Sequence, residues 1–99
     1  MISLANITGF DWDEGNARKN EKHSVSMAEA EQIFFNAPLL ILEDTKHSTK
    51  EPRFHALGKS DDKRQLHITF TLRHAGKNIR VISARDMHKK ERAIYEKTT

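Results

Sequence analysis

The sequence has no cysteine. This absence excludes a disulfide framework, a thiolate nucleophile and any zinc or iron–sulfur site held by cysteine. Long apolar runs are also absent, and residues 1–10 lack the basic start and apolar core of a signal peptide. We therefore expect a soluble, unprocessed cytoplasmic protein without a membrane partner.

Several catalytic motifs are missing as well. There is no G-x-S-x-G nucleophile elbow and no glycine-rich phosphate loop, and a Ser-His-Asp triad has no local motif in its favour. The histidines form no H-x-H or H-x-x-x-H pair and have no carboxylate at ligand spacing. We therefore expect no metal site and no cofactor, and we interpret the histidines as scattered: His23, His47, His55, His67, His74 and His88.

Length and charge limit what is present. A chain of 99 residues suffices for one domain with a modest core, so we expect a single domain over residues 1–99 with one site. Its 17 lysines and arginines exceed its 14 acidic residues, which gives a formal net charge of +3. Many soluble proteins carry as much. The clustering of cations in the C-terminal third is the stronger indication of an acidic partner.

The N-terminal half predicts strands and helices in alternation. Residues 2–12 are typical of a short strand, and residues 13–23 of a surface helix with acids at its start and bases at its end. Ser26 and Glu29 form a capping box that begins a second helix, which ends before Pro38. The core-facing stripe of this second helix would be Met27, Ala30, Ile33, Phe34 and Ala37.

The second half predicts a β-meander. A short apolar run at residues 39–42 indicates a buried strand, and the polar residues 43–52 indicate an exposed loop. Strands follow at residues 53–57 and 65–73, separated by a turn at residues 60–63. A turn at Ala75 and Gly76 leads into a third strand from Lys77. In the strand over residues 65–73, Leu66, Ile68, Phe70 and Leu72 alternate with His67, Thr69, Thr71 and Arg73.

The fold class predicted from these elements is α+β. Strands linked by hairpins are antiparallel, so N-terminal helices should pack on one face of an antiparallel meander. The other face would be open to water or ligand. A C-terminal helix would follow the meander.

The stretch at residues 79–95 changes period midway. Its first part alternates as a strand does, with Ile79, Val81 and Ser83 opposite Arg80, Ile82 and Ala84. Its second part has helical spacing at Met87, Glu91, Ile94 and Tyr95, and we expect Met87 and Ile94 in the core. Cations gather at this junction of strand and helix: Arg80, Arg85, Lys89, Lys90 and Arg92.

This cationic junction suits a phosphate. A strand arginine such as Arg80 must emerge on one face of a sheet, and Arg85 would lie near the free backbone N–H groups of a helix start. Guanidinium groups bind phosphate bidentately and keep their charge throughout a reaction. A solvated, solubilising helix face is the more common explanation for Lys89, Lys90 and Lys97.

A set of motifs resembles the BrnT family and covers the chain from Phe10 onward. No single motif would suffice, but the set is specific and occurs in the family's order. It consists of F-D-W-D-E at residues 10–14, K-H-S-V-S at 22–26 with Glu29, Ala30, Ile33 and Phe34 after it, E-x-R-F-x-A-L-G at 51–58, I-R-V-I-S-A-R at 79–85 and E-R-x-x-Y at 91–95.

The resemblance implies a ribonuclease toxin of a bacterial type II toxin-antitoxin system, with a RelE-like fold. It implies RNA as substrate and a BrnA-like ribbon-helix-helix antitoxin as partner. The antitoxin would bind operator DNA, which the toxin would reach only through it. Metal-independent cleavage by the ribose 2′-hydroxyl and inhibition of translation are expected.

Within this hypothesis we expect Arg80 and Arg85 at the phosphate and Arg53 as a further cation. Lys22, His23 or Tyr95 would transfer protons and orient the substrate. Each of these assignments has a structural alternative: Tyr95 in the core, His23 at the end of the first helix, and Arg53 paired with Glu51 or Asp61. The expected RNA-binding residues are Lys19, Lys22, Lys89 and Arg92.

The sequence departs from the family pattern at two places. Ser24 stands where the family usually has glycine, and Asp86 and Met87 stand where it often has a basic residue and alanine. Asp86 would cap the C-terminal helix, neutralise Arg85 or reduce catalytic power. A non-catalytic nucleic-acid-binding module and a basic surface that docks an acidic partner are the competing interpretations.

Overall fold

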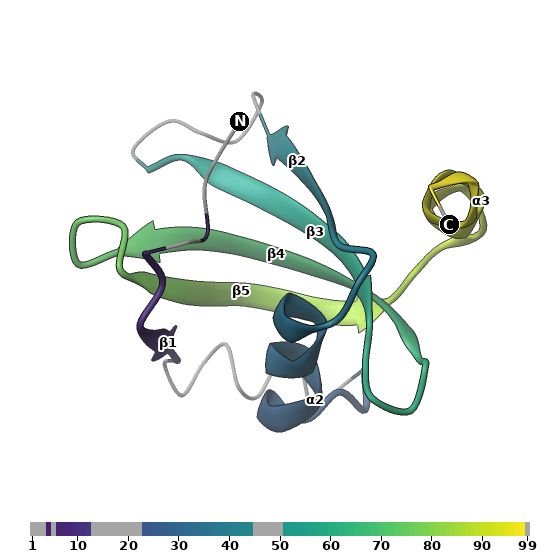
Figure 1. The fold of residues 1–99 in the computed structure, drawn as a ribbon, viewed down its shortest axis with the longest axis horizontal. Coiled ribbons are helices and arrows are strands. Elements are labelled where there is room, and N and C mark those ends of the chain that lie inside the picture. The colour runs from purple at the N-terminus through teal and green to yellow at the C-terminus, as the bar shows by residue number, and fades with distance from the viewer. Residues whose placement is uncertain (1–3, 5, 13–22, 45–50, 99) are drawn as a thin grey trace.

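The computed structural model describes residues 4, 6–12, 23–44 and 51–98. Within them the chain forms a five-stranded sheet with strand order β1-β5-β4-β3-β2 (Figure 1). The predicted helix at residues 13–23 lies outside the described residues except for His23. The elements are β1 Gly9–Asp11, α2 Met27–Gln32, the 3-10 helix η1 Ile33–Phe35, β2 Leu40–Asp44, β3 Arg53–Lys59, β4 Gln65–Arg73, β5 Asn78–Asp86 and α3 Lys89–Lys97.

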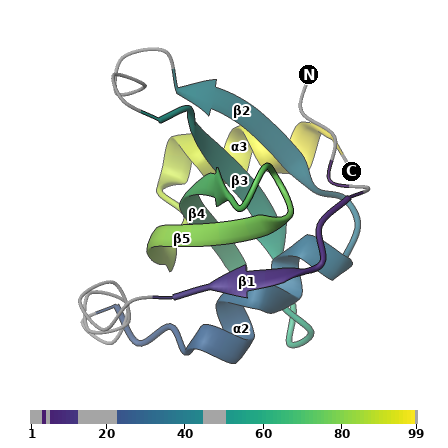
Figure 2. The same cartoon turned by 90° about the vertical axis from the view of Figure 1, so that its left-hand side faces the viewer.

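The sheet is mixed, which corrects the prediction of an antiparallel one. β2 to β5 form the expected antiparallel meander, but β1 pairs with β5 in parallel, with Phe10 opposite Ile79 (Figure 2). No hairpin joins β1 to β5, so the rule that hairpin-linked strands are antiparallel could not predict the direction of β1. Parallel pairing requires a long connection, and here most of the chain lies between the two strands.

The second helix is shorter than predicted. Ser26 caps it as expected, since its Oγ accepts a hydrogen bond from the Glu29 N–H at 3.0 Å. The α-helix ends at Gln32, however, and η1 replaces its predicted last turns. Tight final turns of this kind are common at helix ends. Here Ile33 packs so closely on β3 that a Cβ at Gly58 would lie 3.0 Å from the Ile33 Cβ.

The two faces of the sheet bury different helices. Val25, Ala30 and Ile33 pack against one face, together with apolar side chains of β3, β4 and β5. On the opposite face α3 packs through Tyr95, which joins a smaller cluster of Leu57, Met87 and Leu40. The expectation of a core position is confirmed for Met87 but wrong for Ile94, which is 48% exposed. Tyr95 and Met87 already fill the contact between α3 and the sheet.

A β-bulge changes which residues of β5 share a face. Thr69 pairs with Ser83 while Phe70 pairs with Val81, so Ile82 is an extra residue in β5. The simple alternation predicted for residues 79–84 is therefore wrong beyond Val81. Ser83 joins Arg80 on the open face, and Ala84 joins Ile79 and Val81 in the core.

Arg64 ties three segments together. Its Nε and Nη2 donate to the two oxygens of Asp86 at 2.7 and 3.0 Å. Its Nη1 donates to Glu29 at 2.8 Å and to the Ser24 carbonyl at 2.7 Å. The hydrogen bonds from Arg64 lower the pKa of Asp86. Asp86 therefore pairs with Arg64 and not with Arg85, and His88, not Asp86, is the N-cap of α3.

We expect Arg64→Met to lower the free energy of unfolding by about 2 kcal/mol, because it leaves two carboxylates without their shared cation. Chemical denaturation at neutral pH measures this loss. Arg73→Met is the matched control, since its ion pair with Glu51 is 39% and 41% exposed and should contribute little. Equal effects of the two substitutions would contradict a structural role for Arg64.

Candidate functional site

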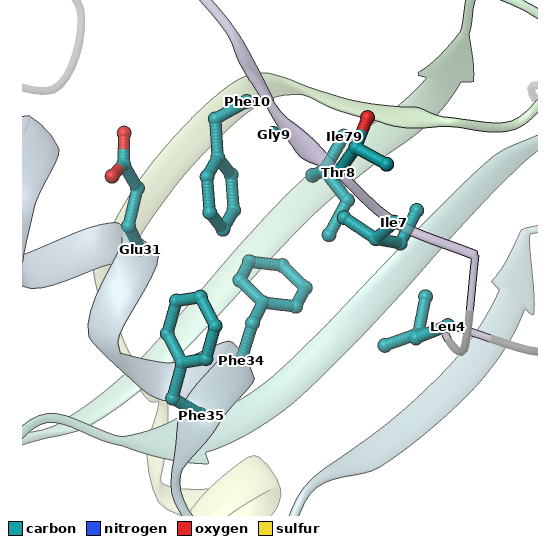
Figure 3. Close-up of a pocket in the computed structure, with 9 residues that line it drawn as sticks. All are labelled: Leu4, Ile7, Thr8, Gly9, Phe10, Glu31, Phe34, Phe35 and Ile79. Carbon is teal, nitrogen blue, oxygen red and sulfur yellow. The ribbon is translucent and has the colours of Figure 1, made fainter.

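One hollow of the molecule is apolar and lies beside β1. It has a volume of about 520 Å³, and Figure 3 shows the rings of Phe10, Phe34 and Phe35 turned toward it. Glu31 is the ionisable residue in its wall, and this carboxylate accepts a hydrogen bond from Trp12 Nε1 at 2.8 Å. The described residues of this wall offer no cation to a phosphate and no free acid–base pair.

A second hollow lies on the open face of the sheet, beside α3. Its volume is about 510 Å³, and its wall combines an arginine, a glutamate and two histidines with hydroxyl and aliphatic groups. Of the two hollows, this is the one whose wall contains the groups that acid–base and phosphate chemistry require. The lining residues are Leu42, His55, Leu57, His67, Thr69, Ser83, Arg85, Glu91 and Ile94.

Arg85 and Glu91 form a bidentate ion pair in this hollow. Arg85 Nη1 and Nη2 donate to Glu91 Oε1 and Oε2 at 2.8 and 3.0 Å. Glu91 Oε1 also accepts the His88 N–H at 2.8 Å, at the start of α3. Burial by itself would raise the pKa of Glu91, but the hydrogen bonds from Arg85 and His88 outweigh it and lower the pKa to about 2.

His67 is a buried, neutral imidazole next to this ion pair. The whole His67 residue is 8% exposed, and the Nε2 atom of its ring lies 3.7 Å from Glu91 Oε2. Burial and the charge of Arg85 lower the pKa of His67 to about 4. Its Nδ1 is buried without a hydrogen-bond partner in the described part of the chain.

His55 stacks on His67 and is held by two partners. The ring centroids are 4.9 Å apart at an interplanar angle of 36°. His55 Nε2 lies 2.9 Å from Asp44 Oδ2, and its Nδ1 lies 3.0 Å from Thr69 Oγ1. A carboxylate in this position fixes the orientation of an imidazole.

The three predicted phosphate ligands share one face of the sheet, at two positions along the strands. Thr71 pairs with both Arg53 and Arg80, so these arginines lie in one row across the sheet. Arg85 pairs with His67, four positions from Thr71 along β4, which is about 13 Å at the usual rise of a strand. In this structure the Arg85 guanidinium bonds the Glu91 carboxylate. Arg80 Nη1 donates a hydrogen bond to Asp11 Oδ2 at 3.4 Å.

The other predicted residues that the structure describes do not line the hollow. Tyr95 is 1% exposed, its hydroxyl donates to the Pro38 carbonyl at 2.7 Å, and burial raises its pKa. His23 is exposed, and its carbonyl accepts a hydrogen bond from Arg64. Lys89 and Arg92 are exposed on α3. Lys19 and Lys22 lie outside the described residues.

Sequence reasoning missed the histidine pair and the role of Glu91. A detectable signal existed: the predicted turn at residues 60–63 joins two predicted strands, and in the resulting hairpin Leu57 pairs with His67 and His55 with Thr69. Both histidines occupy positions of the polar face. The two histidines are not close in sequence, so their spacing did not reveal that the register between neighbouring strands brings them together.

The family model for the ribonuclease toxin BrnT of type II toxin-antitoxin systems matches residues 12–91. The chain belongs to the BrnT family. The resemblance seen in the sequence is thus confirmed, and the match includes the lining residues of the hollow up to Glu91. Comparison with curated proteins gives no match.

Among solved structures, this chain is similar to the Brucella abortus ribonuclease toxin BrnT. The two have a TM-score of 0.62 and 21% sequence identity, over 83% of this chain and 99% of the other. At this identity the similarity supports the α+β fold. Among the described residues, no helix of this BrnT-family chain has the length and apolar character to cross a membrane.

The buried neutral state of His67 predicts a loss of stability in acid. Its pKa is about 4 in the folded chain against 6.5 as the ordinary value, so its contribution is complete above pH 6.5 and is lost as the pH falls toward 4. We expect His67→Gln to remove on the order of 3 kcal/mol of this pH dependence. Urea denaturation at several pH values between these limits measures it. Parallel curves for the wild-type chain and the variant would contradict a buried, neutral His67.

Proposed function

We propose that this BrnT-family chain is an endoribonuclease that cleaves RNA without a metal ion and thereby inhibits translation. The ribose 2′-hydroxyl would attack the adjacent phosphate, so the RNA brings its own nucleophile. The protein must then supply charge stabilisation and proton transfer. The observation that carries the proposal is the hollow in which Arg85 lies beside Glu91 and His67.

Arg85 is proposed to bind the reacting phosphate. Its guanidinium already makes two parallel hydrogen bonds to a carboxylate, and the same geometry fits two phosphate oxygens. A phosphate that replaces Glu91 would keep Arg85 paired, and the displaced Glu91 carboxylate would keep its hydrogen bond from the His88 N–H. The pentacoordinate intermediate carries more negative charge than the ground state, so Arg85 would bind it more tightly.

His55 is proposed as the principal proton-transfer group. Its side chain is 29% exposed, so a substrate hydroxyl can approach it, and Asp44 holds the ring in place. His67 is proposed to support His55 by ring stacking and to keep the hollow free of a second cation. His23 and Lys22 remain our predicted candidates for the second proton transfer.

Tyr95 is proposed as a positioning residue. Its buried hydroxyl bonds Pro38, and its ring fixes α3, the helix that carries Glu91. Arg53 and Arg80 are proposed to bind phosphates that flank the cleaved one, since their row lies further along the same face. Lys19, Lys89 and Arg92 would add general attraction for RNA.

A type II toxin implies an antitoxin partner and an RNA substrate. We propose that the antitoxin is a BrnA-like ribbon-helix-helix protein, through which the complex contacts operator DNA. We also propose a cytoplasmic location and a RelE-like arrangement of the single domain. A non-catalytic binding module is the second candidate. The bidentate ion pair of Arg85 with Glu91 favours it, because this pair occupies the guanidinium that would otherwise bind the reacting phosphate.

We expect Arg85→Ala to abolish RNA cleavage and growth inhibition, with at least about a hundredfold loss in rate. Folding and antitoxin binding should persist, because Glu91 keeps its hydrogen bond from the His88 N–H when Arg85 is removed. Lys97→Ala is the matched control, since it removes a cation at the far end of α3. Cleavage of RNA by the purified wild-type chain measures the activity. An intact substrate with the wild-type chain would favour the binding module.

We expect RNA cleavage by the purified, partner-free chain to continue in millimolar EDTA. The proposed reaction uses only side chains and the ribose 2′-hydroxyl. The described residues contain no group of three or more potential metal ligands. The rate is to be compared with and without EDTA at matched ionic strength. A rate that falls with EDTA and returns with added Mg²⁺ would contradict the metal-independent mechanism.

A further inference from the structure

The hollow beside α3 contains more than a phosphate requires. A phosphate site needs cations and hydrogen-bond donors, whereas this hollow also has three aliphatic side chains in its wall. Two of them are unusually exposed: Leu42 of β2 is 43% exposed and Ile94 of α3 is 48% exposed. Exposed aliphatic groups beside an arginine indicate a ligand with both an apolar surface and a negative charge.

The rest of the wall offers groups for in-plane hydrogen bonds. Thr69 and Ser83 carry hydroxyls, and Glu91 carries a carboxylate. A nucleobase combines flat apolar faces with a polar edge, which matches this wall.

The size of the hollow limits what enters it. At about 510 Å³ it lies within the usual range of small-molecule pockets, roughly 300 to 1,000 Å³. One base fits such a space, but a stacked duplex does not. A base must therefore leave its stack, which costs least in single-stranded RNA.

We propose that the hollow binds one unstacked nucleobase of single-stranded RNA, held between Leu42 and Ile94, next to the phosphate on Arg85. The inference rests on the proposed ribonuclease function and deepens it by naming the substrate class. The base fixes the position of the ribose, and hence of the 2′-hydroxyl, relative to His55. Single-stranded RNA is thereby selected by the shape and chemistry of one cavity.

The test uses single-stranded 2′-O-methyl oligoribonucleotides, which this reaction cannot cleave, and measures their binding by fluorescence anisotropy. The probes are one mixed-sequence strand, its duplex, and a series with one abasic position moved along the strand. We expect the wild-type chain to bind the duplex more weakly and to lose about tenfold in affinity at one abasic position. The Leu42→Ala, Ile94→Ala double variant should lose about tenfold on the intact strand and show no further loss with any abasic probe.

The control is Phe35→Ala, which removes a side chain that is 78% exposed beside the other, apolar hollow. It should bind all probes as the wild-type chain does. The dependence of affinity on salt should be unchanged in the double variant but reduced in Arg85→Ala, because Arg85 is the one of these three substituted residues that is proposed to contact phosphate.

The outcomes separate the two proposals. If the wild-type chain cleaves RNA but no abasic position weakens binding, or if the double variant binds normally, the base site is wrong and the ribonuclease function stands. If the wild-type chain neither cleaves nor binds RNA, both proposals fail. If the double variant loses antitoxin binding and keeps RNA binding, the hollow is a protein-docking site and the base site is overturned.

Discussion

The extra residue in β5 is the constraint on which the open face depends. Arg80 and Arg85 are five positions apart, so in a regular strand they would point to opposite faces of the sheet. The bulge at Ile82 cancels this offset and brings both to one face, with Ser83 between them. The same shift returns Ala84 to the core beside Val81. One irregularity thus satisfies the core and the site together.

Charge in the hollow is nearly balanced before any ligand arrives. Glu91 offsets Arg85, and burial keeps His67 neutral. Long-range attraction of a polyanion must therefore come from cations elsewhere, on the row of Arg53 and Arg80 and on the exposed side of α3. In the proposed mechanism, the long-range attraction of RNA and the chemistry of its cleavage therefore depend on different residues. This division agrees with a protein face that guides an RNA strand toward the hollow.

Local patterns predicted the meander well, and long-range contacts explain where prediction failed. The alternation over residues 65–73 matches β4 in full, because that strand is set by its own period. The parallel pairing of β1, the contact of Arg64 with Asp86 and the stacking of His55 on His67 each join residues distant in sequence. Periodicity carries no information about such partners. The histidine pair is different, because the predicted hairpin already implied the strand register that brings His55 and His67 together.

Glu91 has two structural roles. Its carboxylate holds Arg85 and also accepts a hydrogen bond from the His88 N–H at the start of α3. Loss of this carboxylate would therefore release Arg85 and loosen the beginning of the helix at the same time. The availability of the guanidinium and the stability of the helix start are thus coupled through one side chain.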